Sequence, residues 1–244
     1  MKSYNAYQLK LAMAGLMVLD HLDIISGFIP DQLSLVFHMV TRCVAVFFAY
    51  MVVEGYLHTR NVKAYLLRLY GAAGIMALGN TLLNSLYQSK EIYISNNIFM
   101  TLAVGLTMLV CLRNFAEHTR KQQILQVLSV GLLTILGAFL TEGGTVVLPF
   151  ILITYMGRKS LVKRNIAYGI LALLLLFLSY QPYESIGMTI QMMLYNADWL
   201  FILVLPILSL YNGQAGPRTA FSRYFFYIFY PLHLWLLATI AYLI

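Results

Sequence analysis

The sequence predicts an all-α fold, a polytopic integral membrane bundle of about nine transmembrane helices in a single domain over residues 1–244. Of its residues 61% are hydrophobic and 10% are charged, whereas a soluble domain is about a quarter charged. The mean hydropathy is +0.77. Apolar runs recur along the chain, and their length is close to the roughly 20 residues that a helix needs to cross a bilayer. This composition excludes an ordinary soluble globule, a disordered chain, a collagen and a disulfide scaffold.

Nine apolar windows mark the predicted spans. Each is expected to be a helix, because backbone polar groups in hydrocarbon must be satisfied within the element. The sixth window is short and contains Pro149, and Met188–Tyr195 is either an interfacial helix or the start of the eighth span. The windows cover about 8–28, 36–57, 62–86, 94–113, 122–140, 143–157, 164–181, 197–211 and 224–244.

The first window resembles a signal peptide only in part. Lys2 and Lys10 precede an apolar run, but Asp20, His21 and Asp23 interrupt it and no small-residue cleavage site follows. We therefore expect a helix that is retained.

Basic residues predict the orientation. If the N-terminus is cytoplasmic, only Lys90 of the 16 Lys and Arg residues lies in an outer loop, and only Arg42 lies within a span. All the others fall at the cytoplasmic side, as the positive-inside rule requires. The net charge of +7 is thus explained by topology, and no nucleic-acid partner is expected. Cys43 and Cys111 lie in apolar stretches and predict neither a disulfide framework nor a metal site.

The polar group in the first span is a candidate site, because ionisable side chains inside a membrane are costly. Asp20 and Asp23 are three residues apart and are expected to share a helix face. His21 points about 100° away from Asp20, so its hydrogen-bond partner should come from another helix. His21 is either a general base in the bundle interior or an interfacial histidine that caps the bundle.

The second span carries His38 and Arg42, four residues apart on one face and at the outer depth of Asp20. Two cations there require acidic partners, so Arg42 is predicted to pair with Asp20 or Asp23. Structural and functional roles remain equally open for Arg42, whereas a structural role is favoured for His38.

Polar and aromatic residues also occur in two later spans. Asn97 and Thr101 begin the fourth span, where they either hydrogen-bond between helices or line a site. Tyr227, Tyr230 and His233 follow one another at three-residue spacing in the last span. Such a stripe is typical of packing, but His233 needs a hydrogen-bond partner near the midplane.

A basic turn follows the second span, from Glu54 to Asn61 and on to Lys63 and Arg68. By composition alone a solvated cytoplasmic loop is the better interpretation, and phosphate binding is the alternative. The same two interpretations apply to Gly157–Arg164 and to Arg218.

Several motifs in this order resemble the TraX pilin-acetylase family and cover nearly the whole chain. They are Leu19-Asp20-His21, Arg42 with its apolar run, Val53–Asn61, Lys63–Leu69, Asn96–Leu102, Leu210–Gly213 and Phe226–Leu234. The resemblance implies a multi-pass acyltransferase of the bacterial inner membrane. It would take acetyl groups from cytoplasmic acetyl-CoA and modify an acceptor at the outer side; the named member acetylates the N-terminal amine of a conjugative pilin. His21 would correspond to the catalytic histidine.

The residues and the resemblance together define an expected site. The catalytic residues would be His21, Asp20 and Arg42, and the acceptor, an amine or a peptide N-terminus, would contact Asp23, Asn97, Thr101, His233 and Tyr230. Acetyl-CoA would contact Glu54, His58, Arg60, Lys63, Arg68, Arg158 and Arg218. His21 would remove the acceptor proton, with Arg42, Asn97 or Tyr230 at the oxyanion; an acetyl-histidine intermediate is the other course.

Two other functions stay open. The acidic outer side suits a transporter or channel for a small cation, which would show flux without binding acetyl-CoA. A non-catalytic assembly or immunity partner would tolerate the loss of His21.

Overall fold

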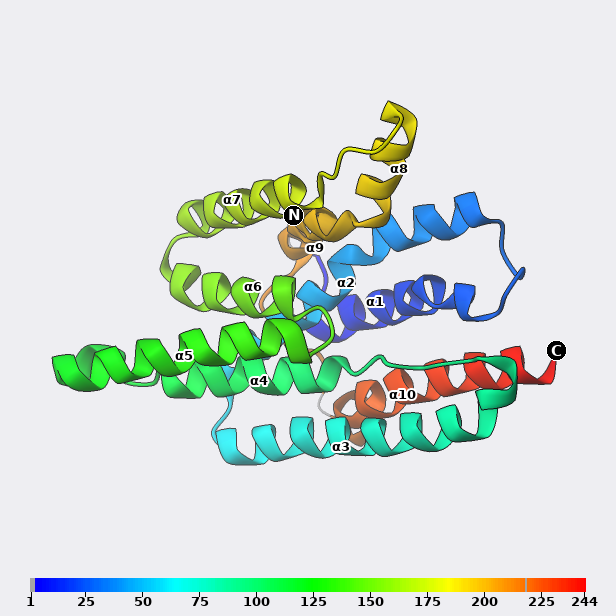
Figure 1. Ribbon diagram of the computed structural model, residues 1–244. Coiled ribbons are helices and arrows are strands. Elements are labelled where there is room, and N and C mark those ends of the chain that lie inside the picture. The colour runs from blue at the N-terminus through cyan, green and yellow to red at the C-terminus, as the bar shows by residue number, and fades with distance from the viewer. Residues whose placement is uncertain (1–2, 218) are drawn as a thin grey trace. The chain divides into compact units, whose positions relative to one another are not determined.

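The computed structural model describes residues 3–217 and 219–244, and Figure 1 shows that its regular elements are helices. One isolated bridge joins Tyr4 and Tyr211, and no strand occurs in the described residues, which confirms the all-α class. The α-helices are α1 (Ala6–Asp20), α2 (Asp31–His58), α3 (Val62–Tyr87), α4 (Ile98–Cys111), α5 (Arg120–Leu140), α6 (Gly144–Met156), α7 (Leu161–Ser179), α8 (Ile186–Tyr195), α9 (Val204–Leu210) and α10 (Ala220–Leu243). The 3-10 turns are η1 (Leu22–Ile24), η2 (Gln88–Lys90), η3 (Phe115–Glu117), η4 (Gly157–Lys159) and η5 (Ala197–Leu203).

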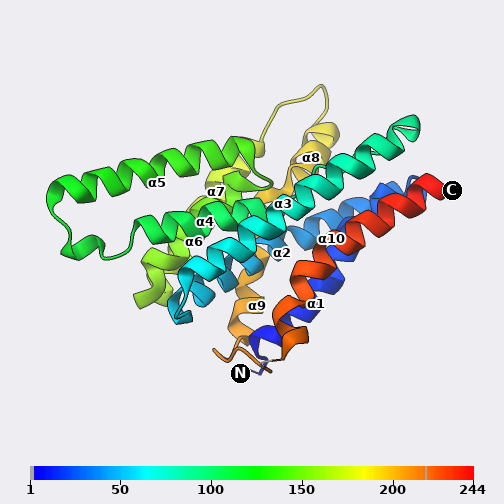
Figure 2. The same cartoon turned by 90° about the horizontal axis from the view of Figure 1, so that it is seen from below.

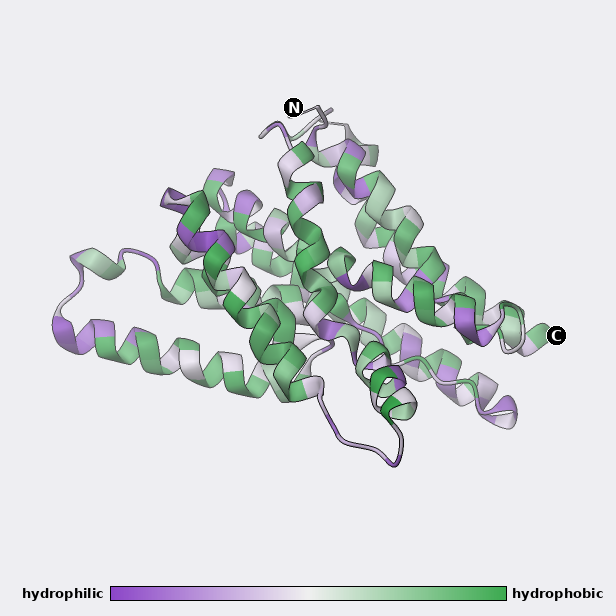
Figure 3. Cartoon of the chain, turned by 90° about the horizontal axis from the view of Figure 1, so that it is seen from above, coloured by the Kyte–Doolittle hydropathy of each residue, from purple (hydrophilic) through white to green (hydrophobic). Residues whose placement is uncertain are grey.

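Within the described residues, six helical segments are long and apolar enough to cross a membrane, namely α2, α3 continued by η2, α4 continued by η3, α5, α7 and α10. A seventh crossing results if α8 and the segment Ala197–Leu210 form one span, bent by 56°. The predicted first and sixth spans fall on α1 and α6, which have 15 and 13 residues. Figure 3 shows hydrophobic residues along most of the helices. The count of nine spans and the cytoplasmic N-terminus stay predictions.

The expectation of one continuous helix over 8–28 is wrong. Helix α1 ends at Asp20, His21 is its C-cap, and η1 follows as a separate turn. Gly27 then adopts a φ of +72°, a left-handed conformation that glycine tolerates and that ends helical structure. Asp20 and Asp23 therefore do not share a helix face.

Reciprocal side-chain caps fix the start of three helices. Asn5 caps α1 with Gln8, Thr119 caps α5 with Gln122, and Thr219 caps α10 with Ser222. Each cap satisfies backbone N–H groups that have no partner inside the helix.

The described chain divides into two compact units, and the first falls within Met1–Phe47, Leu78–Ser95 and Gly169–Ile244. In this unit α1 packs along α10, as both Figure 1 and Figure 2 show. Leu9, Met13 and Met17 recur every four residues and bury one face of α1. On α10 the buried side chains include Tyr230 and His233, so the first unit contains these two predicted acceptor contacts together with all three predicted catalytic residues.

The end of α3 fixes the C-terminal half of α10 in the same unit. The indole nitrogen of Trp235 donates to Oδ1 of Asn80 at 2.9 Å, and the hydroxyls of Tyr87 and Thr239 lie 2.8 Å apart. A Cβ at Gly79 would collide with the Trp235 ring, so this glycine permits the close approach. The Asn80 amide of α3 thus acts between helices.

The second unit comprises Phe48–Ala77 and Asn96–Tyr168 and has α4, α5 and α6 side by side. Gly105 of α4 faces Ile151, and Gly137 of α5 faces Leu148. A Cβ at either glycine would collide with these side chains, which is how small residues let membrane helices approach. Met108, Val130 and Leu148 form the core of the three-helix packing.

Candidate active site

The last residue of α1 forms an ion pair with α2 in the first unit. Nη2 of Arg42 lies 3.1 Å from both carboxylate oxygens of Asp20. Thr41 adds a hydroxyl donor to Oδ1 of Asp20 at 2.5 Å. The pairing of Arg42 with Asp20, one of the two partners expected from charge neutrality, is therefore confirmed. Asp23 is exposed in η1 and is not the partner.

Arg42 also connects α2 with the bend that follows α8. Its Nη1 lies 3.8 Å from Oδ1 of Asp198, and its Nη2 lies 3.2 Å from Nδ1 of His38. Nδ1 of His38 therefore accepts from the guanidinium, and Nε2–H donates to the carbonyl of Tyr195 at 3.0 Å. His38 thus holds α2 to the end of α8, in agreement with the structural role favoured for it.

His21 follows Asp20 and has contacts on two helices. Its Nδ1 lies 2.7 Å from the carbonyl oxygen of Met17 and 3.3 Å from Nε2 of His233. A carbonyl only accepts, so Nδ1 of His21 carries the proton. The partner expected from another helix is therefore present as His233, and the imidazole is held in one tautomer.

His233 is fixed in the same way on α10. Its Nδ1 lies 3.0 Å from the carbonyl of Phe229 and donates to it, so its Nε2 bears a lone pair directed at His21. The side chain is 6% exposed, stacks on the Phe229 ring at 5.1 Å and meets the Tyr230 ring edge-on at 5.7 Å.

The tautomers leave one basic atom on His21. Nδ1–H is shared between the Met17 carbonyl and Nε2 of His233, and within the described residues Nε2 of His21 has no hydrogen-bond partner. The side chain is partly exposed, so this lone pair is open to a proton donor from outside the protein. The arrangement matches that of a general base oriented through its other nitrogen.

Asn97 and Thr101 belong to the second unit, where Glu142 engages both. Oε2 of Glu142 accepts the backbone N–H of Asn97 at 2.5 Å, and Thr101 donates to the Glu142 carbonyl at 2.7 Å. Nδ2 of Asn97 donates to the Ala73 carbonyl at 3.0 Å. The interhelical role left open for these side chains is thus present. Glu142 was missed as their partner, because it lies 45 residues from Asn97 and 41 residues from Thr101 in the sequence.

The residues expected around acetyl-CoA at the end of α2 and the start of α3 are mostly exposed. His58, Arg60, Lys63 and Arg68 are all exposed, and Glu54 is partly buried. Nδ1 of His58 lies 2.8 Å from the Glu54 carbonyl oxygen, and the guanidinium of Arg68 lies over the Tyr65 ring. Arg158 donates to the Tyr155 carbonyl at 2.6 Å and lies over that ring. Arg218 lies outside the described residues.

Comparison with known families decides the relationship. The family model described as TraX protein matches residues 6–241, nearly the whole chain. The chain belongs to the TraX family. A probable fimbrial assembly protein, FimC of serogroup H1 from Dichelobacter nodosus, is 26% identical over 245 residues, which cover 97% of this chain and 95% of the relative. No solved structure matches.

This TraX-family chain therefore combines two features that the sequence presents far apart. His21 and His233 occur 212 residues from one another and meet in the first unit. Tyr230 contacts His233 on α10, and Asp20, the residue before His21, pairs with Arg42. Sequence reasoning missed Asp198 and Tyr195 as partners, since nothing in the pattern places the bend after α8 against α2.

Proposed function

We propose that this chain is a membrane acetyltransferase that moves an acetyl group from acetyl-CoA to an amine, with His21 as the general base. The observation that carries the proposal is the partly exposed Nε2 of His21, whose ring is oriented by the Met17 carbonyl and His233 in a TraX-family chain. The relative named for fimbrial assembly supports a peptide N-terminus as acceptor, in line with a role in pilus or fimbrial assembly.

The proposed reaction conserves atoms and charge. The neutral amine attacks the thioester carbonyl, forming the N–C bond, and Nε2 of His21 takes the proton that leaves the nitrogen. Collapse of the tetrahedral intermediate breaks the C–S bond, and His21 returns the proton to the thiolate, giving free coenzyme A. The products are the acetylated amine and the free thiol.

His233 supports this reaction by orienting His21. Its lone pair accepts part of the Nδ1–H of His21, so the imidazolium formed during proton transfer gains a second acceptor. His233 is therefore proposed as a positioning residue, in place of the acceptor contact expected from sequence. Arg42 remains a candidate for the oxyanion, although its Nε and Nη2 already donate to the His38 carbonyl and Asp20.

The cation-transport alternative fits these contacts less well. Both carboxylate oxygens of Asp20 accept from Arg42, so the charge that would bind a cation is already neutralised. The name of the relative does favour a non-catalytic assembly role as the second candidate. A non-catalytic assembly role does not require the basic Nε2 of His21, whereas acetyl transfer does. The loss of His21 therefore distinguishes the two functions.

The orientation belongs to the same proposal. With the N-terminus in the cytoplasm of a bacterial cell and about nine spans, acetyl-CoA would approach the basic side and the acceptor the outer side. Glu54, His58, Arg60, Lys63, Arg68, Arg158 and Arg218 are the proposed contacts of acetyl-CoA, because Arg and Lys are the usual ligands of phosphate groups.

The test uses purified protein in phosphatidylcholine nanodiscs with deuterated acetyl-CoA. The probe acceptor is a lysine-free peptide with a free N-terminus, and the same peptide with a blocked N-terminus is the control. We expect label on the free amine, and a fall of about 10² to 10⁴ in the rate for His21→Ala. His118→Ala, a histidine replacement in the loop before α5, should leave the rate unchanged.

Folding of His21→Ala is checked by its elution and thermal unfolding profile. Full transfer activity in folded His21→Ala protein would remove His21 from the reaction. Absence of transfer by the original chain to this and to pilin-derived peptides, with fimbrial assembly intact in cells that carry His21→Ala, would favour the assembly role.

A further inference from the structure

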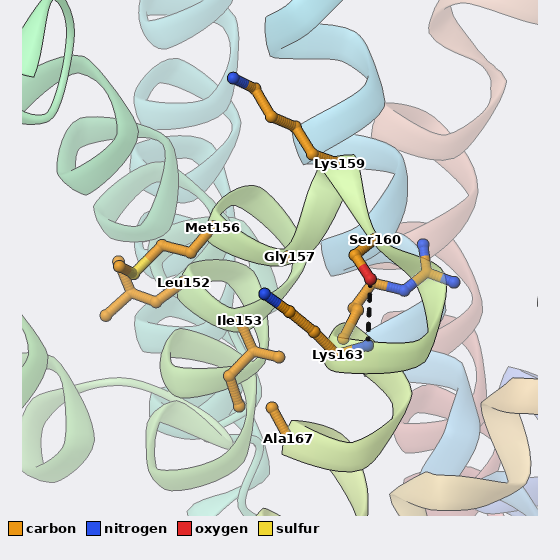
Figure 4. A pocket seen from close by; sticks show the side chains of 9 residues that line it. Leu152, Ile153, Met156, Gly157, Lys159, Ser160, Lys163 and Ala167 are labelled. Carbon is orange, nitrogen blue, oxygen red and sulfur yellow. Dashed lines mark hydrogen bonds between the residues drawn. The ribbon is translucent and has the colours of Figure 1, made fainter. Parts of the chain in front are cut away.

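The turn between α6 and α7 in the second unit borders an open basic pocket. A cavity of about 450 Å³ is lined by Lys159, Ser160, Lys163 and Arg164 together with Leu152, Ile153, Met156, Gly157 and Ala167. Figure 4 shows Lys163 extending toward Ile153, and Lys159 projecting from the other side of the turn. The volume lies within the roughly 300–1,000 Å³ of small-molecule sites.

Arg164 is the buried cation of this pocket. It is 9% exposed, and its contacts are neutral: Oδ1 of Asn165 at 3.4 Å, a hydrogen bond with Tyr50, and the rings of Tyr50 and Tyr168. Among the described residues no carboxylate lies within 4.0 Å of its guanidinium. A buried charge is costly unless an opposite charge compensates it, so the site favours an anion.

The surrounding sequence supplies no acidic residue for that purpose. No Asp or Glu occurs between Glu142 and Glu184, while Arg158, Lys159, Lys163 and Arg164 occur within this stretch. The first turn of α7 adds backbone N–H groups and the positive end of its helix dipole. The positive charge of this turn therefore has no acidic counterpart nearby in the sequence.

Gly157 allows this geometry. A Cβ at Gly157 would lie 2.7 Å from Cβ of Arg164, so only glycine lets the turn approach α7 at this point. The apolar side chains of Leu152, Ile153 and Met156 form the other wall. The pocket therefore offers a forked guanidinium and an ammonium beside an apolar surface.

We propose that this pocket binds a phosphate ester that carries a less polar group. Arginine and lysine recognise phosphate by charge-assisted hydrogen bonds, and the apolar wall accepts the attached organic part. Two ligands share this chemistry: coenzyme A, which rests on the proposed acetyl transfer, and the headgroup of an anionic phospholipid, which does not. Lys159, Lys163 and Arg164 are added to Arg158, the residue that sequence reasoning selected from this turn.

The experiment measures binding without turnover, in the His21→Ala background. One arm titrates coenzyme A into protein in phosphatidylcholine nanodiscs. The other uses native mass spectrometry to count phosphatidylglycerol bound from mixed micelles with phosphatidylcholine. The variants are Lys163→Gln, Arg164→Gln and Gly157→Ala. The matched control, Arg120→Gln with Lys121→Gln, removes two exposed charges from the start of α5.

We expect the pocket variants to weaken one of the two ligands about tenfold, the effect of one lost charge-assisted hydrogen bond, while the control keeps the original affinity. Loss confined to coenzyme A identifies the acyl donor as the ligand, and loss confined to phosphatidylglycerol identifies a lipid site. Lys163 is exposed, so the Lys163→Gln variant tests the pocket even if the Arg164→Gln variant does not fold. Unchanged binding of both ligands, or equal losses in the control, would overturn the proposal whatever the outcome for acetyl transfer.

Discussion

Nε2 of His233 lies 3.3 Å from Nδ1 of His21, although α1 and α10 stand at opposite ends of the sequence. Each imidazole donates its own Nδ1–H to a carbonyl four residues earlier in its helix. The two rings therefore differ in the use of the Nε2 lone pair. His233 directs this lone pair at His21, whereas the Nε2 lone pair of His21 is available to another molecule. This asymmetry supports the proposal that His21 is the base and that His233 orients it.

Replacing His233 should affect the rate more than binding. His233→Leu removes the acceptor that orients His21, and we expect kcat to fall about ten- to hundredfold, because small displacements of a base are costly. KM for acetyl-CoA should change little. His233→Asn, which keeps an acceptor, should recover part of the loss. A KM effect without a kcat effect would place His233 in binding, as first expected from the sequence.

The Asp20–Arg42 pair should stabilise the first unit cooperatively. Asp20→Asn or Arg42→Met leaves a partly buried charge unpaired, and each should lower the free energy of unfolding by about 1–3 kcal/mol. The double variant should lose less than the sum of the two. Thermal unfolding in detergent measures the stability of the two single variants and of the double variant. Strictly additive losses would contradict the pairing.

Charge neutrality made part of this site predictable. A cation in the second span had to find a carboxylate, and few were present at that depth, so the pairing of Arg42 followed from the sequence. The all-α class followed from composition in the same way. Both inferences use properties that do not depend on how the helices pack.

The parts of the fold and the site that the sequence did not predict depend on how the helices pack. That His21 finds His233 depends on α1 packing along α10, and no spacing in the sequence encodes that neighbour. The end of α1 at Asp20 was missed because hydropathy continues beyond it, whereas the helix ends at its C-cap His21 and a separate 3-10 turn follows. The sequence predicts Arg164 as one of the cations of a loop, whereas its side chain is buried in the structure.

Glu142 should stabilise the start of α4. Its carboxylate accepts the N–H of Asn97 and the amide of Asn96 at the positive end of the helix. Glu142→Ala should therefore cost about 1–2 kcal/mol of unfolding free energy. Glu117→Ala, an exposed acid in η3, should stay within about 0.5 kcal/mol of the original. Equal effects of the two substitutions would argue against the cap.

Two glycines of α3 offer a matched pair for testing how closely α10 approaches. A Cβ at Gly79 would collide with the Trp235 ring, whereas a Cβ at Gly74 meets nothing within 4 Å. Gly79→Ala should force the indole away from Asn80 and destabilise the protein by about 1–3 kcal/mol.

Gly74→Ala should be neutral or stabilising by up to about 1 kcal/mol, because alanine favours helix. The unfolding temperature and Trp fluorescence of both variants provide the check. Since Trp235 and His233 lie on the same helix two residues apart, a Gly79→Ala chain that remains folded should also lose acetyl transfer. An unaltered rate in that chain would show that the His233–His21 contact does not depend on where α3 holds α10.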